Sequence, residues 1–169
     1  SSGVIRSNTI SYNKDQPSAG TSGGGICCSA SSSPDIIKND ITYNEATEGG
    51  GIGCFGFSAP YISENNISYN VAHGTSGSEG GGIRADGSLI ENNIIMSNSS
   101  APGVGGGMSA DNSTVKGNII VDNYAKDSGG GLHCEGTVIL INNIINKNRT
   151  GRFGGGCLIA GGTFTITNN

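Results

Sequence analysis

A six-residue pattern, Asn-x-Ile-x-x-Asn, recurs six times along the 169-residue chain, and its first asparagine steps by 31, 26, 28, 25 and 25 residues. A second pattern, three glycines followed by an apolar residue, alternates with it without exception. Such self-similarity is the signature of a repeat architecture. The asparagine copies begin at Asn8, Asn39, Asn65, Asn93, Asn118 and Asn143, with a seventh expected at Asn168, and the glycine runs begin at Gly23, Gly49, Gly80, Gly105, Gly129 and Gly154.

The repeat length and the residue types indicate a solenoid of strands. Gly and Asn are poor residues for helix interiors, and no segment keeps apolar residues at helical spacing. A period of about 25 residues fits one coil of a parallel β-helix, in which each strand pairs with its equivalent roughly 4.8 Å along the axis. We therefore predict an all-β fold: a single-stranded right-handed parallel β-helix of about six coils with an Asn ladder. Residues 1–169 are expected to form one domain, a piece of a longer solenoid.

Apolar residues at fixed places in the repeat predict the inward rows. The residue after each glycine run forms one row, and the residue two positions later forms a second row of mostly small side chains. A third row precedes the asparagine pattern, and the Ile of that pattern supplies a fourth. The first three rows are Ile26, Ile52, Ile83, Met108, Leu132 and Cys157; Cys28, Cys54, Ala85, Ala110, Cys134 and Ile159; and Ile5, Ile36, Ile62, Ile90, Val115 and Leu140.

The recurring Asn and Gly residues have a physical role in such a coil. Asparagine tolerates left-handed backbone conformations and bonds local backbone groups, so we expect the pattern asparagines to occupy the turns. Stacked on successive coils, their amides can bond one another. The glycine runs are expected to open a tight corner and to fit a narrow core. These runs hold 18 of the 31 glycines.

Charge and hydropathy exclude several classes of function. The net charge of −4 argues against nucleic-acid binding, which needs a basic face. No apolar run approaches the length of a membrane span. The five cysteines do not form a framework of spaced pairs. Buried free thiols are the expectation, although Cys28 and Cys54, one coil apart, could bridge.

One outward strip could carry chemistry. Arg84 and Asp86, Ser109 and Asp111, and His133 and Glu135 occupy equivalent positions on three consecutive coils, about 5 Å apart. Carboxylates at this spacing could serve as acid and nucleophile on a sugar, and Asp86, Asp111 and Glu135 could bind calcium; otherwise no cofactor is expected. A lyase could use Arg84 as a base. The competing interpretation is an ordinary polar face that keeps the strands soluble.

Two further outward rows could contact a ligand or partner. Tyr12, Tyr43 and Tyr69 share one position on the first three coils, where they could stack on sugar rings or on one another. A second row is apolar and suggests cover by a loop or a partner, unless the turn rotates it inward. Its members are Ile94, Ile119 and Ile144, with Met96 and Val121 beside them.

Loop length varies most at one edge of the repeat, between the second asparagine and the glycine run. In repeat proteins this edge is often the binding edge, although neutral length drift is the alternative. The variable loops are Lys14–Ser22, Glu45–Glu48, Val71–Glu79, Ser99–Val104, Tyr124–Ser128 and Arg149–Phe153.

The paired patterns resemble the repeats of chlamydial polymorphic membrane proteins and, more broadly, the right-handed parallel β-helices of bacterial surface proteins and pectate-lyase-like enzymes. The resemblance is carried by the Ile10/Asn13 to Ile145/Asn148 pairs and by the glycine runs. It implies a secreted or cell-surface location. Because one coil type carries many activities, several functions stay open. These are a module for binding or adhesion to polysaccharide or another surface, a polysaccharide lyase or glycoside hydrolase using the strip Arg84–Glu135, and a structural spacer that self-associates end to end or laterally.

Overall fold

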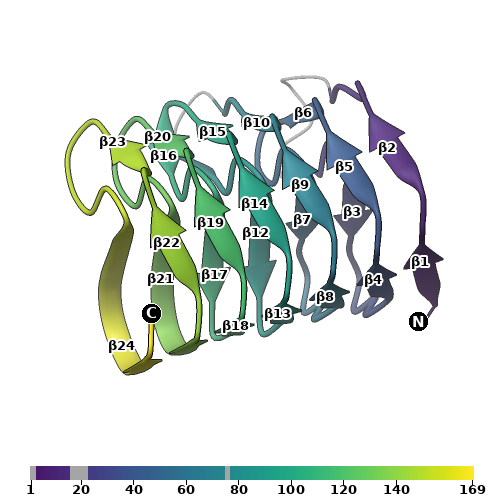
Figure 1. The fold of residues 1–169 in the computed structure, drawn as a ribbon. Helices are drawn as coiled ribbons and strands as arrows, with labels where there is room; N and C mark the ends of the chain where they lie inside the picture. Colours follow the sequence, from purple (N-terminus) through teal and green to yellow (C-terminus); the bar gives the residue numbers. More distant parts are fainter. Residues whose placement is uncertain (1–2, 16–22, 75–76) are drawn as a thin grey trace.

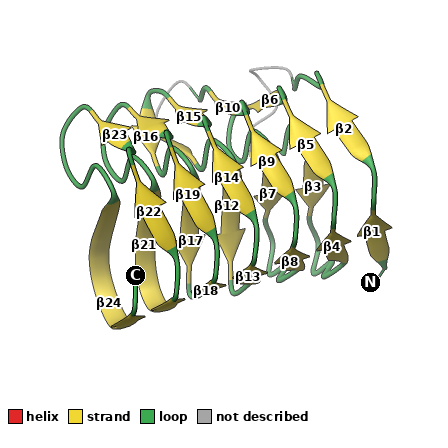
Figure 2. Ribbon diagram, in the orientation of Figure 1, coloured by secondary structure: helices red, strands yellow, loops and turns green. Residues whose placement is uncertain are grey.

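The computed structural model describes residues 3–15, 23–74 and 77–169 of the chain. The described residues contain no helix, and parallel strands stack as a β-solenoid of about five turns (Figures 1 and 2). The predicted all-β parallel solenoid is confirmed. Parts of two predicted variable loops, residues 16–22 and 75–76, lie outside the described residues.

Each turn passes through short strands that stack on their equivalents, and we number these stacks as columns 1 to 4. Columns 1 and 2 belong to one sheet, because the long strands β21 and β24 run through both. Column 1 consists of β3 (Ile26–Cys28), β7 (Ile52–Cys54), β12 (Ile83–Asp86), β17 (Met108–Asp111) and the first halves of β21 (Leu132–Ile141) and β24 (Cys157–Thr167). Column 2 consists of β1 (Val4–Arg6), β4 (Asp35–Ile37), β8 (Tyr61–Ser63), β13 (Leu89–Glu91), β18 (Thr114–Lys116) and the second halves of β21 and β24.

The rest of each turn supplies columns 3 and 4, each a separate parallel sheet. Column 3 is the front face in Figure 1. A further two-stranded sheet joins two of the loops that lead to the glycine runs. Column 3 consists of β2 (Thr9–Ser11), β5 (Asp40–Thr42), β9 (Asn66–Ser68), β14 (Ile94–Met96), β19 (Ile119–Val121) and β22 (Ile144–Asn146). Column 4 consists of β6 (Glu45–Ala46), β10 (Val71–Ala72), β15 (Ser99–Ser100), β20 (Tyr124–Ala125) and β23 (Arg149–Thr150). The separate two-stranded sheet consists of β11 (Ser78–Glu79) and β16 (Gly103–Val104).

The core is a set of apolar stacks that run along the solenoid axis, as the repeat predicts. Inward residues of columns 1, 2 and 3 pair in register with their equivalents one coil away, and between the terminal rungs they are fully or almost fully buried. Column 4 contributes small side chains, such as Ala46 and Ala125, which let the turn close tightly. On the last rung, Cys157 and Ile159 keep the register, but Cys157 is only half-buried and Ile159 is exposed.

Two ladders of asparagine side chains run the length of the solenoid. In each ladder, the Oδ1 atom accepts hydrogen bonds from the backbone N–H and the Nδ2 of the asparagine one coil earlier. The Nδ2 also donates to a backbone carbonyl of the preceding coil, so the buried amide is well satisfied. The ladders are Asn8, Asn39, Asn65, Asn93, Asn118, Asn143 and Asn169, and Asn13, Asn44, Asn70, Asn98, Asn123 and Asn148.

The prediction that the ladder asparagines take the left-handed conformation is wrong. No ladder asparagine of the described residues has a positive φ; the residue before each one does, with values from +54° to +64°. The chain turns at that preceding residue, which leaves the asparagine side chain directed inward to bond the next coil. The outward-facing turn residue is free to vary, and includes Tyr43, Glu64 and Lys147.

The seventh asparagine copy begins at Asn169, one residue later than predicted. The backbone N–H and Nδ2 of Asn143 donate to Asn169 Oδ1 at 2.9 and 2.7 Å. The strand register shifts between Glu135 and Thr137, because Gly161 and Gly162 occupy the place of a single glycine in the coil before. The extra residue is taken up between columns 1 and 2, and the ladder continues.

The glycine runs form a corner where successive coils approach too closely for a side chain, as predicted. The first glycine has a positive φ in every run after the first, for example +64° at Gly80. A Cβ atom on the third glycine, Gly82, would lie 2.6 Å from the carbonyl oxygen of Gly107 and 3.0 Å from the Asn98 side chain. The corner therefore requires the absence of a side chain as well as backbone freedom.

Replacing Asn98 with alanine should lower the free energy of unfolding by about 3 kcal/mol, because several buried groups lose their partners. Asn98 Nδ2 donates to Ile67 O at 2.8 Å and to Asn123 Oδ1 at 3.1 Å, and its Oδ1 accepts from Asn70. Asn66→Ala is the matched control. The exposed side chain of Asn66 donates to the Asp40 carboxylate at the surface, so its loss should cost under about 0.5 kcal/mol. Urea unfolding followed by circular dichroism measures both, and equal losses would contradict the role of the ladder.

The Gly82→Ala substitution should destabilise the fold by about 2–3 kcal/mol, because the new methyl group meets backbone atoms of the next coil. The equivalent third glycine on the last rung, Gly156, has space for a methyl group, whose nearest neighbour would be Ile145 Cγ2 at 3.5 Å. Gly156→Ala should therefore change the midpoint of thermal unfolding much less. If the two variants unfold at the same temperature, close packing is not the reason for the glycines.

Candidate functional site

The predicted outward strip exists in register on column 1. Arg84 pairs with Ser109, and Asp86 with Asp111, on neighbouring rungs, and Ser109 pairs with His133 on the next. The burial differs from that of an ordinary solvent-exposed strand face. Asp86 and Glu135 are exposed, whereas His133 is 7% exposed and Ser109 is 1% exposed.

The corner before the glycine runs covers this face with two glutamates. Arg84 Nε lies 3.6 Å from Glu48 Oε2 and 3.4 Å from Glu79 Oε2. Its Nη1 donates to the carbonyl of Cys54 at 3.2 Å, and its guanidinium lies 5.3 Å from the centre of the Phe55 ring. Arg84 thus joins two successive coils around one half-buried cation.

Sequence reasoning missed Glu48 and Glu79, although both end predicted variable loops. Each lies immediately before a glycine run, at the same position of the repeat. That shared position is the signal that could have found them, because equivalent residues of a solenoid stack on one another. They face the cation from the corner, so the cluster has two more carboxylates than the strip alone.

Ser109, Asp111 and His133 form the second part of the cluster. Ser109 Oγ donates to Glu79 Oε2 at 3.3 Å, and Asp111 Oδ1 accepts the Glu135 backbone N–H at 3.1 Å. His133 Nε2 lies 3.8 Å from Glu135 Oε1, and its buried Nδ1 has no hydrogen-bond partner. Asp86 is turned to a different partner, since its Oδ1 accepts from Asn112 Nδ2 at 3.0 Å.

Burial changes the proton affinity of two carboxyl groups here. It raises the pKa of Asp111, and the nearby Glu79 raises that pKa further, whereas the Glu135 backbone N–H, Arg84 and His133 lower it. The pKa of Glu48 is also raised by burial and by Glu79, against the effect of Arg84. A carboxyl with a raised pKa can donate a proton at higher pH than an exposed one. Catalytic roles for Arg84, Asp86, Asp111, His133 and Glu135 stay predictions.

Neither a metal site nor a pocket is found in the described part of the chain. No group of three His, Cys, Asp or Glu residues in residues 3–15, 23–74 and 77–169 is arranged to hold a metal ion, and these residues line no pocket. Calcium at Asp86, Asp111 and Glu135 therefore gains no support from the geometry.

The tyrosine row forms a stack of parallel rings at the edge of column 3. The centres of Tyr12 and Tyr43 lie 5.0 Å apart with 2° between the ring planes, and those of Tyr43 and Tyr69 lie 4.9 Å apart with 5°. Each ring therefore covers the face of its neighbour. A sugar could reach the outer face of Tyr12, which is the most exposed of the three; this binding role stays a prediction.

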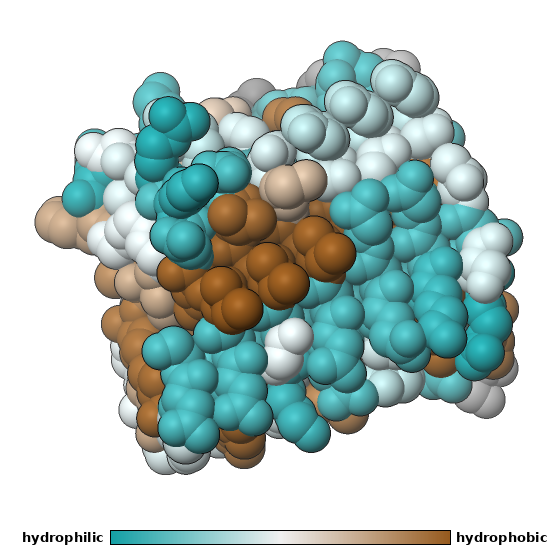
Figure 3. All heavy atoms as spheres, viewed as in Figure 1, coloured by the Kyte–Doolittle hydropathy of each residue, from teal (hydrophilic) through white to brown (hydrophobic). Residues whose placement is uncertain are grey.

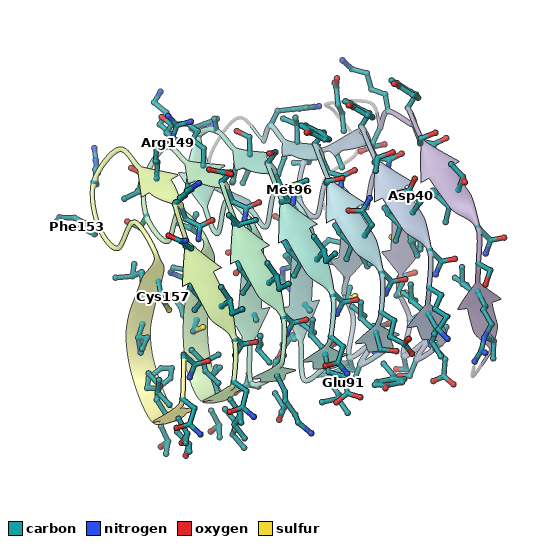
Figure 4. The ribbon with its side chains drawn as sticks, in the orientation of Figure 1. Asp40, Glu91, Met96, Arg149, Phe153 and Cys157 are labelled. Carbon is teal, nitrogen blue, oxygen red and sulfur yellow. The ribbon has the colours of Figure 1, made fainter. Side chains whose placement is uncertain are left out.

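The apolar row faces outward and forms a continuous patch, so the alternative in which the turn rotates it inward is wrong. Ile94, Ile119 and Ile144 pair in register and are 44%, 39% and 58% exposed, with the half-buried Met96 and Val121 beside them. Figure 3 shows the patch at the centre of the column 3 face, and Figure 4 labels Met96 within it and Asp40 on the polar half of the same sheet. We call Ile94, Met96, Ile119, Val121 and Ile144 the apolar strip.

All five cysteines are free thiols. Cys28, Cys54 and Cys134 are buried and Cys157 is half-buried on the inward face, as predicted, whereas Cys27 is exposed on the outward face. Cys157 is labelled in Figure 4 at the start of β24.

No protein-family model matches the chain, and no curated protein or solved structure is significantly similar to it. The resemblance to chlamydial polymorphic membrane proteins and pectate-lyase-like enzymes is thus unsupported by a family match. The structure shows the parallel β-solenoid fold alone. None of the described residues forms a helix able to cross a membrane.

The Asp111→Asn substitution should change the pH dependence of stability. Folding favours the protonated Asp111, so the wild-type free energy of unfolding should fall as pH rises from the ordinary value of 3.8 through the raised pKa. Asparagine stays neutral and can still accept the Glu135 N–H, so the variant should lack this fall and gain stability relative to wild type toward neutral pH. Urea unfolding between about pH 3 and 7 measures the difference; parallel profiles throughout that range would contradict it.

Proposed function

We propose that the chain is a non-catalytic binding module of a secreted or cell-surface protein, and that it contacts a partner protein through the apolar strip. The observation that carries this proposal is the outward exposure of Ile94, Ile119 and Ile144 on one sheet face. Contiguous apolar patches of this kind mark interaction surfaces on soluble proteins. The secreted or surface location is supported by the sequence resemblance.

The chemistry of the strip favours a protein over a polysaccharide. All five side chains are aliphatic or thioether groups. Sugar recognition relies on aromatic faces and on hydrogen-bonding groups, whereas aliphatic clusters fill the centres of protein interfaces. A stable interface buries about 800 Å² on each partner, with an apolar centre and a polar rim. The strip supplies such a centre, and Asp40 and Asn66 of column 3 lie on its polar side.

The Ile119→Lys substitution tests the proposal, because it places a charge at the middle of the strip without touching the buried ladders. Thr9→Lys introduces the same charge at the exposed far end of the same sheet, on β2, and is the control. A phage-displayed peptide library, selected on the wild-type chain, should yield peptides rich in apolar residues. We expect Ile119→Lys to weaken their binding tenfold or more, roughly the effect of losing one central contact, and Thr9→Lys to leave it unchanged.

Other occupants of the strip would give different results. Sedimentation with cellulose or chitin particles that is lost in Ile119→Lys would replace the protein partner with a polysaccharide. A wild-type dimer that Ile119→Lys dissociates would assign the strip to a second copy of this chain. Peptides that bind both lysine variants as well as wild type would show that the strip is not the contact surface.

A further inference from the structure

Two buried cysteines face each other on adjacent rungs of column 1. The strands β3 and β7 pair in parallel with Cys28 directly opposite Cys54, and both side chains point into the core, at 3% and 0% exposure. Opposed residues of neighbouring parallel strands lie about 4.8 Å apart. That spacing falls inside the range of about 4.4–6.8 Å between the Cα atoms of disulfide-linked cysteines.

The two thiols are already in contact. A hydrogen bond between the side chains lowers the pKa of Cys28 and raises that of Cys54, so Cys54 is the donor and Cys28 the sulfur that carries charge more readily. The thiolate is the form that attacks a disulfide. Cys28 is therefore the nucleophile of the pair.

A second contact between thiols provides an internal comparison. Cys134 and Cys157 also share a side-chain hydrogen bond, but the register pairs Cys157 with Leu132, and Cys134 with Ile159. They are diagonal neighbours, for which the separation is about 7–8 Å. A disulfide there would need the backbone to move.

Both thiols of the first pair are buried, so a small oxidant reaches them when the coil opens locally.

We propose that Cys28 and Cys54 are a site of disulfide formation that links the first two column 1 strands covalently when the chain meets a small disulfide oxidant such as glutathione disulfide. Cys28 thiolate attacks one glutathione sulfur and releases one glutathione thiolate. Cys54, as its thiolate, then attacks the Cys28 sulfur and displaces the second glutathione. Two cysteine thiols give up two electrons and two protons, and one glutathione disulfide becomes two molecules of glutathione.

The site goes beyond the proposed binding role, because it does not involve column 3. The link would close the chain between residues 28 and 54 and restrict the unfolded state. It should raise the apparent Tm by roughly 5–10 °C. A matched variant is available: Cys54→Ala should fold, since Ala85 and Ala110 occupy the same inward row on the next two coils.

The experiment incubates the reduced full chain in a buffer of glutathione and glutathione disulfide until the products stop changing. Free thiols are then blocked with iodoacetamide in denaturant, and the digest is mapped by mass spectrometry. We expect a cross-linked peptide joining Cys28 to Cys54, a higher Tm that a reductant reverses, and alkylated Cys134 and Cys157. Cys27, which lies opposite Gly53 rather than another cysteine, should be alkylated or carry glutathione.

Two control variants test the assignment. Cys54→Ala should lose both the cross-linked peptide and the rise in Tm, whereas Cys27→Ser should keep both. If no Cys28–Cys54 peptide forms, even when the chain is refolded in the same buffer, the proposal is overturned. A Cys134–Cys157 link that forms equally well would overturn the argument from register.

Discussion

The hydrogen bonds between stacked asparagine side chains are the interaction on which the rest of the structure depends. Each ladder amide is buried, and its Oδ1 accepts two hydrogen bonds from the coil before. A buried amide without partners is costly, so a coil that slipped by one residue would lose these bonds at two places in its turn. The two ladders therefore hold every coil in phase, and the apolar stacks between them align as a result.

The repeat uses the inward positions for the apolar stacks and the ladders, so residues that contact other molecules must lie at outward positions. On column 1 the outward residues and the corner glutamates assemble a half-buried ionic cluster around Arg84. On column 3 the outward residues change along the axis from polar to apolar, which gives the sheet two different halves. These two surfaces lie on different columns of one rigid coil, so a change in one need not disturb the other.

Much of the fold could be predicted from the sequence because the ladder and core positions repeat. Ile83 and Met108 pair as predicted since both follow a glycine run. The turn residues were harder, because left-handed positions are filled here by residues such as Tyr43 and Glu64, which rarely adopt that conformation. Glu48 and Glu79 were missed because their loops differ in length. Counted from the asparagine pattern, the two glutamates fall at different positions, although both directly precede a glycine run. The burial of His133 depends on how the corner before the glycine runs folds over the strand, which the sequence around His133 does not indicate.

The doubled glycine at Gly161 and Gly162 shows how such a coil tolerates a change in length. One residue is added between columns 1 and 2, yet Asn169 still receives both hydrogen bonds from Asn143. The ladder hydrogen bonds fix where each coil aligns with the next, whatever the number of residues between them. An insertion is thereby confined to a single coil, and a gene encoding such a repeat can drift in length without shifting the coils that follow.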